Sequence, residues 1–186
     1  VCVSVSVSVC LCVMCGVDVD MLILNVRPQA KQALVSRDDA WKKIEEAAKR
    51  NITVVEQSVA NSGEVLQAAQ VLAQKQVEAF VKIGDYATIQ GFGSIAKVGL
   101  EKKIPVYSVD PPDIDLPGCL AVIGWNYRDD GMAAGKLAVR VLKGEAPATM
   151  AFEPLTKTDL LVSQATAKAI GVTLPEELLK RADKVV

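Results

Sequence analysis

From Met21 to the C-terminus, short apolar runs alternate with amphipathic stretches of helical length. Short apolar runs are typical of strands buried on both faces, and apolar residues at three- and four-residue spacing are typical of helices packed on one side. This alternation predicts an α/β fold: a doubly wound, mainly parallel sheet with right-handed crossovers and helices on both faces. We expect strands at 21–26, 52–55, 77–83, 104–108, 120–124 and 160–162.

The boundaries of the helices follow from residues that commonly begin or end them. Ser36, Asn61 with Ser62, and Ser163 are expected N-caps, because their side chains can accept a hydrogen bond from a free backbone N–H. Val65, Leu66, Ala69 and Leu72 are the predicted apolar stripe of the second helix. We expect helices at 36–50, from 61 onward, and at 84–100, 129–144, 163–171 and 175–182.

Residues 1–20 differ from the rest, since Val alternates there with Cys or Ser. A GT-rich simple repeat gives this pattern when translated, so we interpret the segment as a start-site or frame artefact replacing an N-terminal half. It has neither the positive n-region nor the small-residue cleavage pattern of a secretory signal. It does contain a CxxC spacing, but no helix begins there as a redox site requires. A zinc site with Cys12 and Cys15 would need further ligands from Cys2, Cys10 and the distant Cys119.

The composition excludes several classes of function. The chain has no histidine, which removes the commonest general base and the commonest zinc ligand. Its net charge of -1 and its 4% aromatic content give no support to nucleic-acid binding. No apolar run is long enough to span a bilayer. These features favour a binding module over an enzyme, and we assign no catalytic residue, cofactor or metal.

Two further patterns have a structural and a functional interpretation. Residues 91–96 read GFGSIA, which matches the outline of a dinucleotide fingerprint, but the glycines lie well past the preceding strand. We therefore expect them to allow close helix packing. Asp110, Asp113 and Asp115 share one proline-rich loop. Without EF-hand spacing, a solvated loop is favoured over a metal site.

Ligands of a doubly wound sheet bind beyond the carboxyl ends of its strands. Asp85 follows a predicted strand and precedes a helix, so its carboxylate would suit an ammonium group, although an aspartate there also commonly caps a helix. The candidate ligand-binding residues at this edge are Asn61, Ser62, Asp85, Tyr86, Ser108 and Asp110.

An ordered set of motifs covers roughly three quarters of the chain. The motifs are NSGEV at 61–65, Asp85 after a strand, KIPV at 103–106, GWNY at 124–127, Gly131 with Gly135, VLKG at 141–144, AKAIGVTLP at 167–175 and RAD at 181–183. Together they resemble the ABC-transporter substrate-binding family, whose members include carriers of aromatic amino acids.

The resemblance implies one lobe of a type I periplasmic-binding fold, in which two α/β lobes joined by hinge strands close on a ligand. Residues 21–124 and 150–186 would form the C-terminal lobe, and residues 125–149 would belong to an N-terminal lobe that is otherwise absent. The implied function is that of the solute-binding component of an ABC importer, here truncated. It would capture a small polar ligand, such as an amino acid, and deliver it to a membrane permease. The alternatives are a ligand-sensing domain of a receptor or regulator, and an inactive fragment.

The resemblance also implies a monomer located in the periplasm or outside the cell near the membrane. Asp85 matches the family aspartate that meets a ligand amine. The chain departs from the family pattern on both sides of it, with Gly84 in place of Thr and Tyr86 in place of Asn. Ser163 stands where the family has Asn. These departures leave the ligand open, and Tyr86 has a ring that can stack on an aromatic ligand.

Overall fold

The computed structural model describes residues 21–26, 54–82, 84, 86–151 and 157–186. Within these residues, seven strands form one sheet in the order β2-β1-β3-β4-β5-β6-β7. All neighbouring strands are parallel except β5 and β6, which are antiparallel. The predicted α/β fold with a mainly parallel sheet is therefore confirmed. The strands are β1 (Met21–Val26), β2 (Val54–Val59), β3 (Ala79–Lys82), β4 (Val106–Ser108), β5 (Cys119–Trp125), β6 (Thr158–Val162) and β7 (Lys184–Val185).

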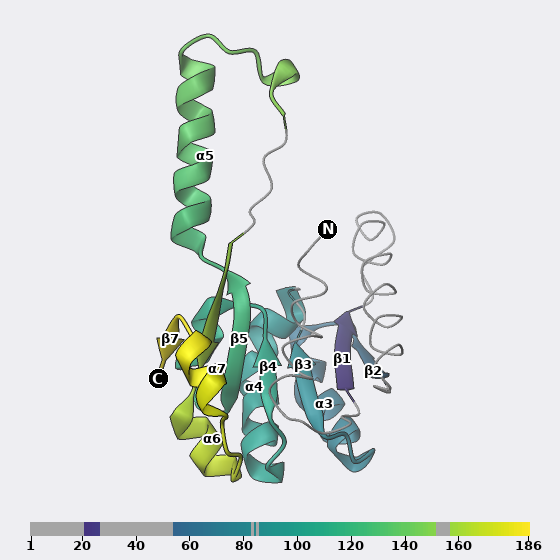
Figure 1. Ribbon diagram of the computed structural model, residues 1–186. Helices are drawn as coiled ribbons and strands as arrows, with labels where there is room; N and C mark the ends of the chain where they lie inside the picture. The colour runs from purple at the N-terminus through teal and green to yellow at the C-terminus, as the bar shows by residue number, and fades with distance from the viewer. Residues whose placement is uncertain (1–20, 27–53, 83, 85, 152–156) are drawn as a thin grey trace.

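Figure 1 shows helices against the sheet and one helix, α5, standing away from it. The α-helices are α3 (Val65–Gln74), α4 (Tyr86–Lys102), α5 (Tyr127–Leu142), α6 (Gln164–Ile170) and α7 (Glu176–Arg181). Short 3-10 turns lie at η1 (Ser62–Glu64), η2 (Pro111–Asp115) and η3 (Pro147–Thr149).

The core consists of two apolar clusters on opposite faces of the sheet. Successive side chains of a strand point to opposite faces, and in β3 Phe80 belongs to one cluster while Ala79 and Val81 belong to the other. Residues of α3 and α4 pack in the first cluster, and residues of α6 and α7 in the second. Burial on both faces explains why these strands are continuous apolar runs in the sequence.

The packing of α3 against α4 tests two of the sequence predictions. A Cβ added to Gly91 would lie 2.6 Å from a methyl group of Val65, so this glycine does allow close helix packing. The same prediction is wrong for Gly93, which would have nothing within 4 Å of an added Cβ. The predicted stripe of α3 is wrong at Leu66, which is exposed, because the spacing of the buried positions passes through Ala68 instead.

The observed bounds of other elements differ from the predicted ones by a few residues. The second strand lies at Val54–Val59, so its predicted end at residue 55 is wrong, since an edge strand can continue through the polar residues that follow its apolar run. The helix predicted from 129 begins at Tyr127, because the side chain of Asn126 accepts a hydrogen bond from the N–H of Arg128 at 3.0 Å. The short strand β7 was not predicted. The predicted helix at 36–50 and the interpretation of residues 1–20 lie outside the described residues.

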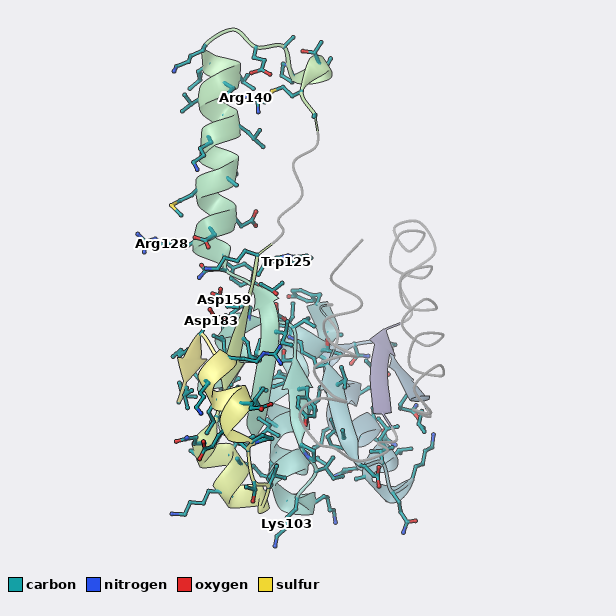
Figure 2. All side chains as sticks on the ribbon, in the orientation of Figure 1. Lys103, Trp125, Arg128, Arg140, Asp159 and Asp183 are labelled. Carbon is teal, nitrogen blue, oxygen red and sulfur yellow. The ribbon has the colours of Figure 1, made fainter. Side chains whose placement is uncertain are left out.

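Helix α5 is attached to the sheet at one end. None of its residues is buried, and Figure 2 shows Arg128 near the sheet and Arg140 at the far end of the helix. Among the helices described, none is long and apolar enough to cross a membrane. The assignment of residues 125–149 to a separate lobe remains a prediction.

Candidate functional site

The carboxyl ends of β3, β4 and β5 carry a connected group of polar side chains. Lys82 is the last residue of β3, Ser108 is the last residue of β4, and Asp110 follows two positions later. Tyr127 comes two residues after the end of β5. Because these strands are parallel neighbours, their ends meet at one edge of the sheet, which is the edge where doubly wound folds bind ligands.

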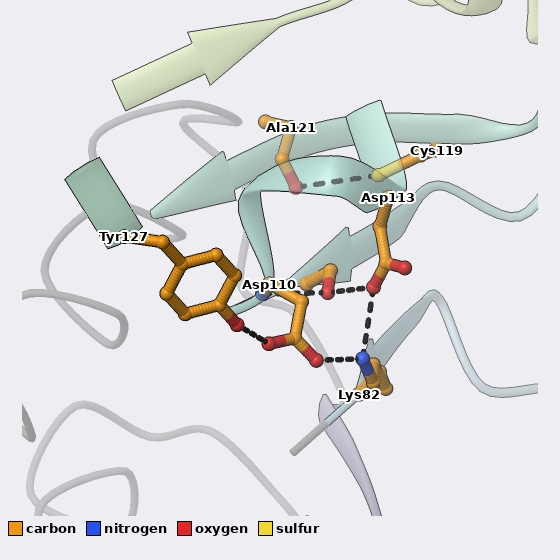
Figure 3. Close-up of polar contacts among 7 residues, drawn as sticks. Lys82, Asp110, Asp113, Cys119, Ala121 and Tyr127 are labelled. Carbon is orange, nitrogen blue, oxygen red and sulfur yellow. Dashed lines mark hydrogen bonds and ion pairs between the residues drawn. The ribbon is translucent and has the colours of Figure 1, made fainter. Parts of the chain in front are cut away.

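Lys82 is the centre of this group and is 0% exposed. Its ammonium group donates hydrogen bonds to Asp110 and to Asp113, the latter over 2.9 Å (Figure 3). The ammonium group also lies 5.4 Å from the centre of the Phe92 ring. A buried charge is tolerated when it is paired and fully hydrogen-bonded. The two carboxylates and the ring therefore explain how a lysine can end a buried strand.

Asp113 is also buried, and the hydroxyl of Ser108 donates a hydrogen bond to it. The Ser108 hydroxyl accepts another from the N–H of Asp110 at 3.1 Å. The Ser108 hydroxyl thus connects the two aspartates inside the protein, and its assignment as a ligand-binding residue stays a prediction.

The prediction of a solvated loop is wrong for Asp110 and Asp113. The two prolines begin the turn η2, which directs Asp113 inward, and only Asp115 behaves as expected, with an exposed ion pair to Lys184 at 3.0 Å. Within the described part of the chain, no three His, Cys, Asp or Glu side chains gather in a way that could hold a metal ion.

Gly124 lets this loop lie directly on β5. A Cβ added at Gly124 would approach the carbonyl oxygen of Val109 to 2.1 Å and the ring of Pro111 to 2.9 Å. A backbone oxygen cannot yield to such a contact as a flexible side chain would. The absence of a side chain at Gly124 therefore allows the loop that carries Asp110 to pack directly on β5.

Tyr127 closes the group on its exposed side. Its hydroxyl donates a hydrogen bond of 2.6 Å to the Asp110 oxygen that does not face Lys82. This bond to a carboxylate, with smaller contributions from burial and negative charge, raises the pKa of Tyr127 to about 12. Burial alone would raise the pKa of Asp110, but the hydrogen bonds from Lys82 and Tyr127 and the lysine charge outweigh it and lower that pKa.

Three aromatic side chains are exposed at the same edge. Tyr86, the first residue of α4, is 80% exposed; Tyr127 is 57% exposed and Trp125 is 40% exposed. Trp125 is the last residue of β5, Tyr86 begins α4 after β3, and Tyr127 contacts Asp110 through its hydroxyl. The edge combines an anionic acceptor with surfaces on which a flat apolar group can pack.

The remaining predicted site residues do not contact the group around Lys82 in any described interaction. Asn61 and Ser62 lie just beyond the end of β2, so they belong to the same edge, two strands away from β3. Asn61 caps the turn η1 by accepting from the N–H of Gly63 at 2.9 Å, and its amide donates to Glu64 at 3.0 Å. Asp85 lies outside the described residues, so the prediction that it binds an amine is not tested.

Sequence reasoning missed Lys82, Asp113 and Tyr127. The signal for Lys82 was present, because a lysine inside the apolar run 79–83 requires an anionic partner. The aspartate-rich loop was the obvious source of that partner. Tyr127 gave no such signal, since an aromatic residue at the start of a helix is ordinary.

The fold and the site define a class of protein: one lobe of a binding protein with the type I periplasmic-binding fold. The model of the family "ABC transporter substrate binding protein" matches residues 23–186, and the chain belongs to this family.

Related proteins agree with this assignment. The chain is 30% identical over 126 residues to the tyrosine-binding protein of Clostridioides difficile (strain R20291). This match covers 68% of the chain and 36% of that protein. The ABC domain of Streptococcus pneumonia, solved in complex with L-Trp, superposes with a TM-score of 0.83 at 23% identity. It matches 96% of this chain and 59% of its own.

A third relative is the ligand-free, open structure of a substrate-binding protein with adhesive properties from Clostridium difficile. Its TM-score is 0.65 at 26% identity, and the match covers 89% of this chain and 53% of that chain. The chain therefore spans from about a third to three fifths of the length of these relatives.

Proposed function

We propose that this chain is part of the solute-binding component of an ABC importer and that it binds an aromatic amino acid at the carboxyl edge of its sheet. The observation that carries the proposal is the combination at this edge of a fixed carboxylate, Asp110, with the exposed rings of Tyr86, Trp125 and Tyr127. The relatives support the choice of ligand, since one is named for tyrosine and another was solved with L-Trp.

The chemistry of an aromatic amino acid fits this edge in two ways. The ligand ammonium requires an anionic acceptor, and charge-assisted hydrogen bonds to a carboxylate are among the strong ones. The ligand ring gains most from packing on another ring, in stacked or edge-on geometry. Asp85 is a second candidate acceptor by resemblance to the family. Two acidic positions at one edge also disfavour a ligand whose only charge is negative.

Helix α5 supports the proposal that the ligand is enclosed by two lobes. Met132, Val139 and Leu142 are large apolar residues exposed on this helix. The relatives are longer than this chain, and their extra length can supply a lobe that covers those side chains and the open side of the site. Closure of the two lobes would desolvate the ligand and present it to a permease outside the cytoplasm, with no bond made or broken.

Ligand binding can be measured by the shift of the thermal unfolding midpoint, because a ligand that binds only the folded state raises it. We expect L-tyrosine or L-tryptophan to raise it. L-alanine, which lacks the ring, and 3-phenylpropionate, which lacks the ammonium, should have much weaker effects. Asp110→Ala should weaken binding by roughly ten-fold or more, since a hydrogen bond to a charged group is lost.

The matched control is Lys184→Met, which breaks an exposed ion pair far from the edge and should leave the affinity unchanged. Equal responses to L-tyrosine and L-alanine would refute the aromatic-ligand proposal. Sequencing the DNA upstream of the Val1 codon tests the two-lobe part of the proposal. A frame encoding a further lobe would support it, and binding should then be tighter in the extended chain than in this one.

A further inference from the structure

The direction in which α5 leaves the sheet depends on contacts at one end of the helix. The chain departs after Trp125 and returns at Thr158, and these two residues are paired across β5 and β6. No residue of α5 is buried, so apolar packing does not fix the helix against the sheet. A helix attached in this way can pivot about its first turn unless polar contacts there restrain it.

Two kinds of polar contact occur at this junction, which Figure 2 marks by Trp125, Arg128 and Asp159. The first kind joins the departing and returning segments to each other. Asn126 donates to Asp159 at 2.8 Å, and the exposed Lys157 lies 3.6 Å from Asp159 and 3.9 Å from Asp129. The exposed ion pairs of Lys157 contribute little. Because both partners of each contact belong to the junction itself, these contacts do not hold α5 in one direction relative to the sheet.

The second kind joins α5 to a different part of the sheet. The hydroxyl of Tyr127, in the first turn of α5, donates a hydrogen bond to Asp110, which belongs to the loop after β4. Asp110 cannot follow the helix if the helix moves, because its other carboxylate oxygen is held by the buried Lys82 at the end of β3 (Figure 3). One carboxylate thus connects a fixed cation in the core with the base of a projecting helix.

We propose that Lys82 is a positioning residue which, through Asp110 and Tyr127, sets the direction of α5 relative to the sheet. The hydroxyl of Tyr127 and the carboxylate of Asp110 act as a releasable latch, and Lys82 is its anchor. The latch acts between the sheet and the segment that we assign to another lobe, but the inference concerns this chain alone and does not depend on ligand binding.

The test measures the distance between two fluorophores by resonance energy transfer in the full chain. The fluorophores are introduced as non-natural residues at Lys97 on α4 and at Lys136 on α5, both exposed. Tyr127→Phe removes only the hydroxyl. A hydrogen bond to a charged group corresponds to roughly a ten-fold change in the equilibrium between held and released orientations, so the distance distribution should broaden or shift markedly. Lys184→Met should leave it as in the parent chain.

A second pair of variants isolates the contribution of Lys82, and the double variant of this pair keeps the net charge of the cluster. Asp113→Asn retains the contact between Lys82 and Asp110, so we expect the parent distribution. Lys82→Met combined with Asp113→Asn leaves Asp110 without its cation, and we expect the broad distribution of Tyr127→Phe. Circular dichroism of each variant serves as the control for folding.

Two results would overturn the inference. One is a distribution for Tyr127→Phe that matches the parent chain. The other is a narrow, unshifted distribution for the Lys82→Met and Asp113→Asn double variant. Because no ligand is added, neither result bears on whether the protein binds an amino acid.

Discussion

Replacing Lys82 by methionine removes a buried cation and keeps an unbranched side chain of similar length. The change leaves the carboxylates of Asp110 and Asp113 close together with no cation between them, and their side chains are 15% and 9% exposed. Removing one partner from a buried ion pair typically costs about 3–5 kcal/mol. Since single domains are stable by only about 5–15 kcal/mol, Lys82→Met should remove a large fraction of the free energy of unfolding.

Thermal and urea unfolding followed by circular dichroism measure this loss. For a chain of this size, about 1 kcal/mol corresponds to roughly 2–4 °C, so the midpoint should fall by roughly 6–20 °C. The exposed pair of Lys184 and Asp115 provides a comparison, because Lys184→Met should cost less than about 1 kcal/mol. Combining Lys82→Met with Asp110→Asn and Asp113→Asn should recover most of the loss, since neutral amides do not repel each other.

The dependence on pH provides a second check of the same reasoning. Lys82 helps to lower the pKa of Asp110, so without the lysine this carboxylate takes up a proton more readily, and the stability deficit of Lys82→Met should shrink as the pH falls towards the titration range of Asp110. A loss below about 1 kcal/mol for Lys82→Met would refute the assignment of a buried, paired cation. A triple variant as unstable as Lys82→Met would show that lost packing, not unpaired charge, causes the effect.

Three further predictions concern neighbouring residues. Gly124→Ala should lower the free energy of unfolding by roughly 1–3 kcal/mol in urea, because the added Cβ meets a backbone oxygen. Gly135→Ala, which adds a Cβ into open space on α5, should be neutral or stabilising. Equal effects of the two substitutions would contradict this packing. In a spectrophotometric titration, one phenol should ionise near pH 12, and this step should be absent in Tyr127→Phe. The stability that the Tyr127 contact contributes should be fully present below pH 10 and should be lost as the pH rises towards 12. Asp110 has a pKa below the ordinary aspartate value of 3.8, so its contribution to stability is present above pH 3.8 and is lost as the pH falls through the lower folded value. Asp110→Ala should flatten this acid limb of the stability profile.

The strands were predictable because most of them are buried on both faces. The run before Lys82 and the run at 160–162 contain almost nothing but apolar residues, and the structure places both within strands. Ser163 was predictable as a helix cap for a local reason, since its hydroxyl accepts from the N–H of Thr166 at 3.2 Å, three residues away. Interactions that span a few residues leave a readable pattern in one sequence.

The cluster around Lys82 was not predicted because its partners are distant along the chain. Asp110 and Asp113 are separated from Lys82 by 28 and 31 positions, and their contact depends on the strand order and on the turn η2. A chemical rule could have paired the lysine with an aspartate in the loop. It could not have shown that Asp115, in the same loop, points to Lys184 instead.

The position of α5 away from the sheet could not be predicted from the sequence pattern either. Its apolar spacing is that of any helix that covers a sheet, so periodicity alone predicts a helix without saying which surface it covers. Only the resemblance to a family assigned residues 125–149 to another lobe. Leu142 and Val139 are exposed apolar residues on this helix, as expected for a helix that packs against another lobe.

The antiparallel pairing of β5 with β6 makes the segment 126–157 topologically dispensable. Trp125 and Thr158 are direct partners in the ladder, so the chain departs and re-enters at adjacent points of one sheet edge. Tight turns of two residues routinely join antiparallel neighbours. A hairpin turn in place of 126–157 would complete the sheet with unchanged strand order, so the junction of Trp125 and Thr158 is a point at which a foreign domain can be grafted.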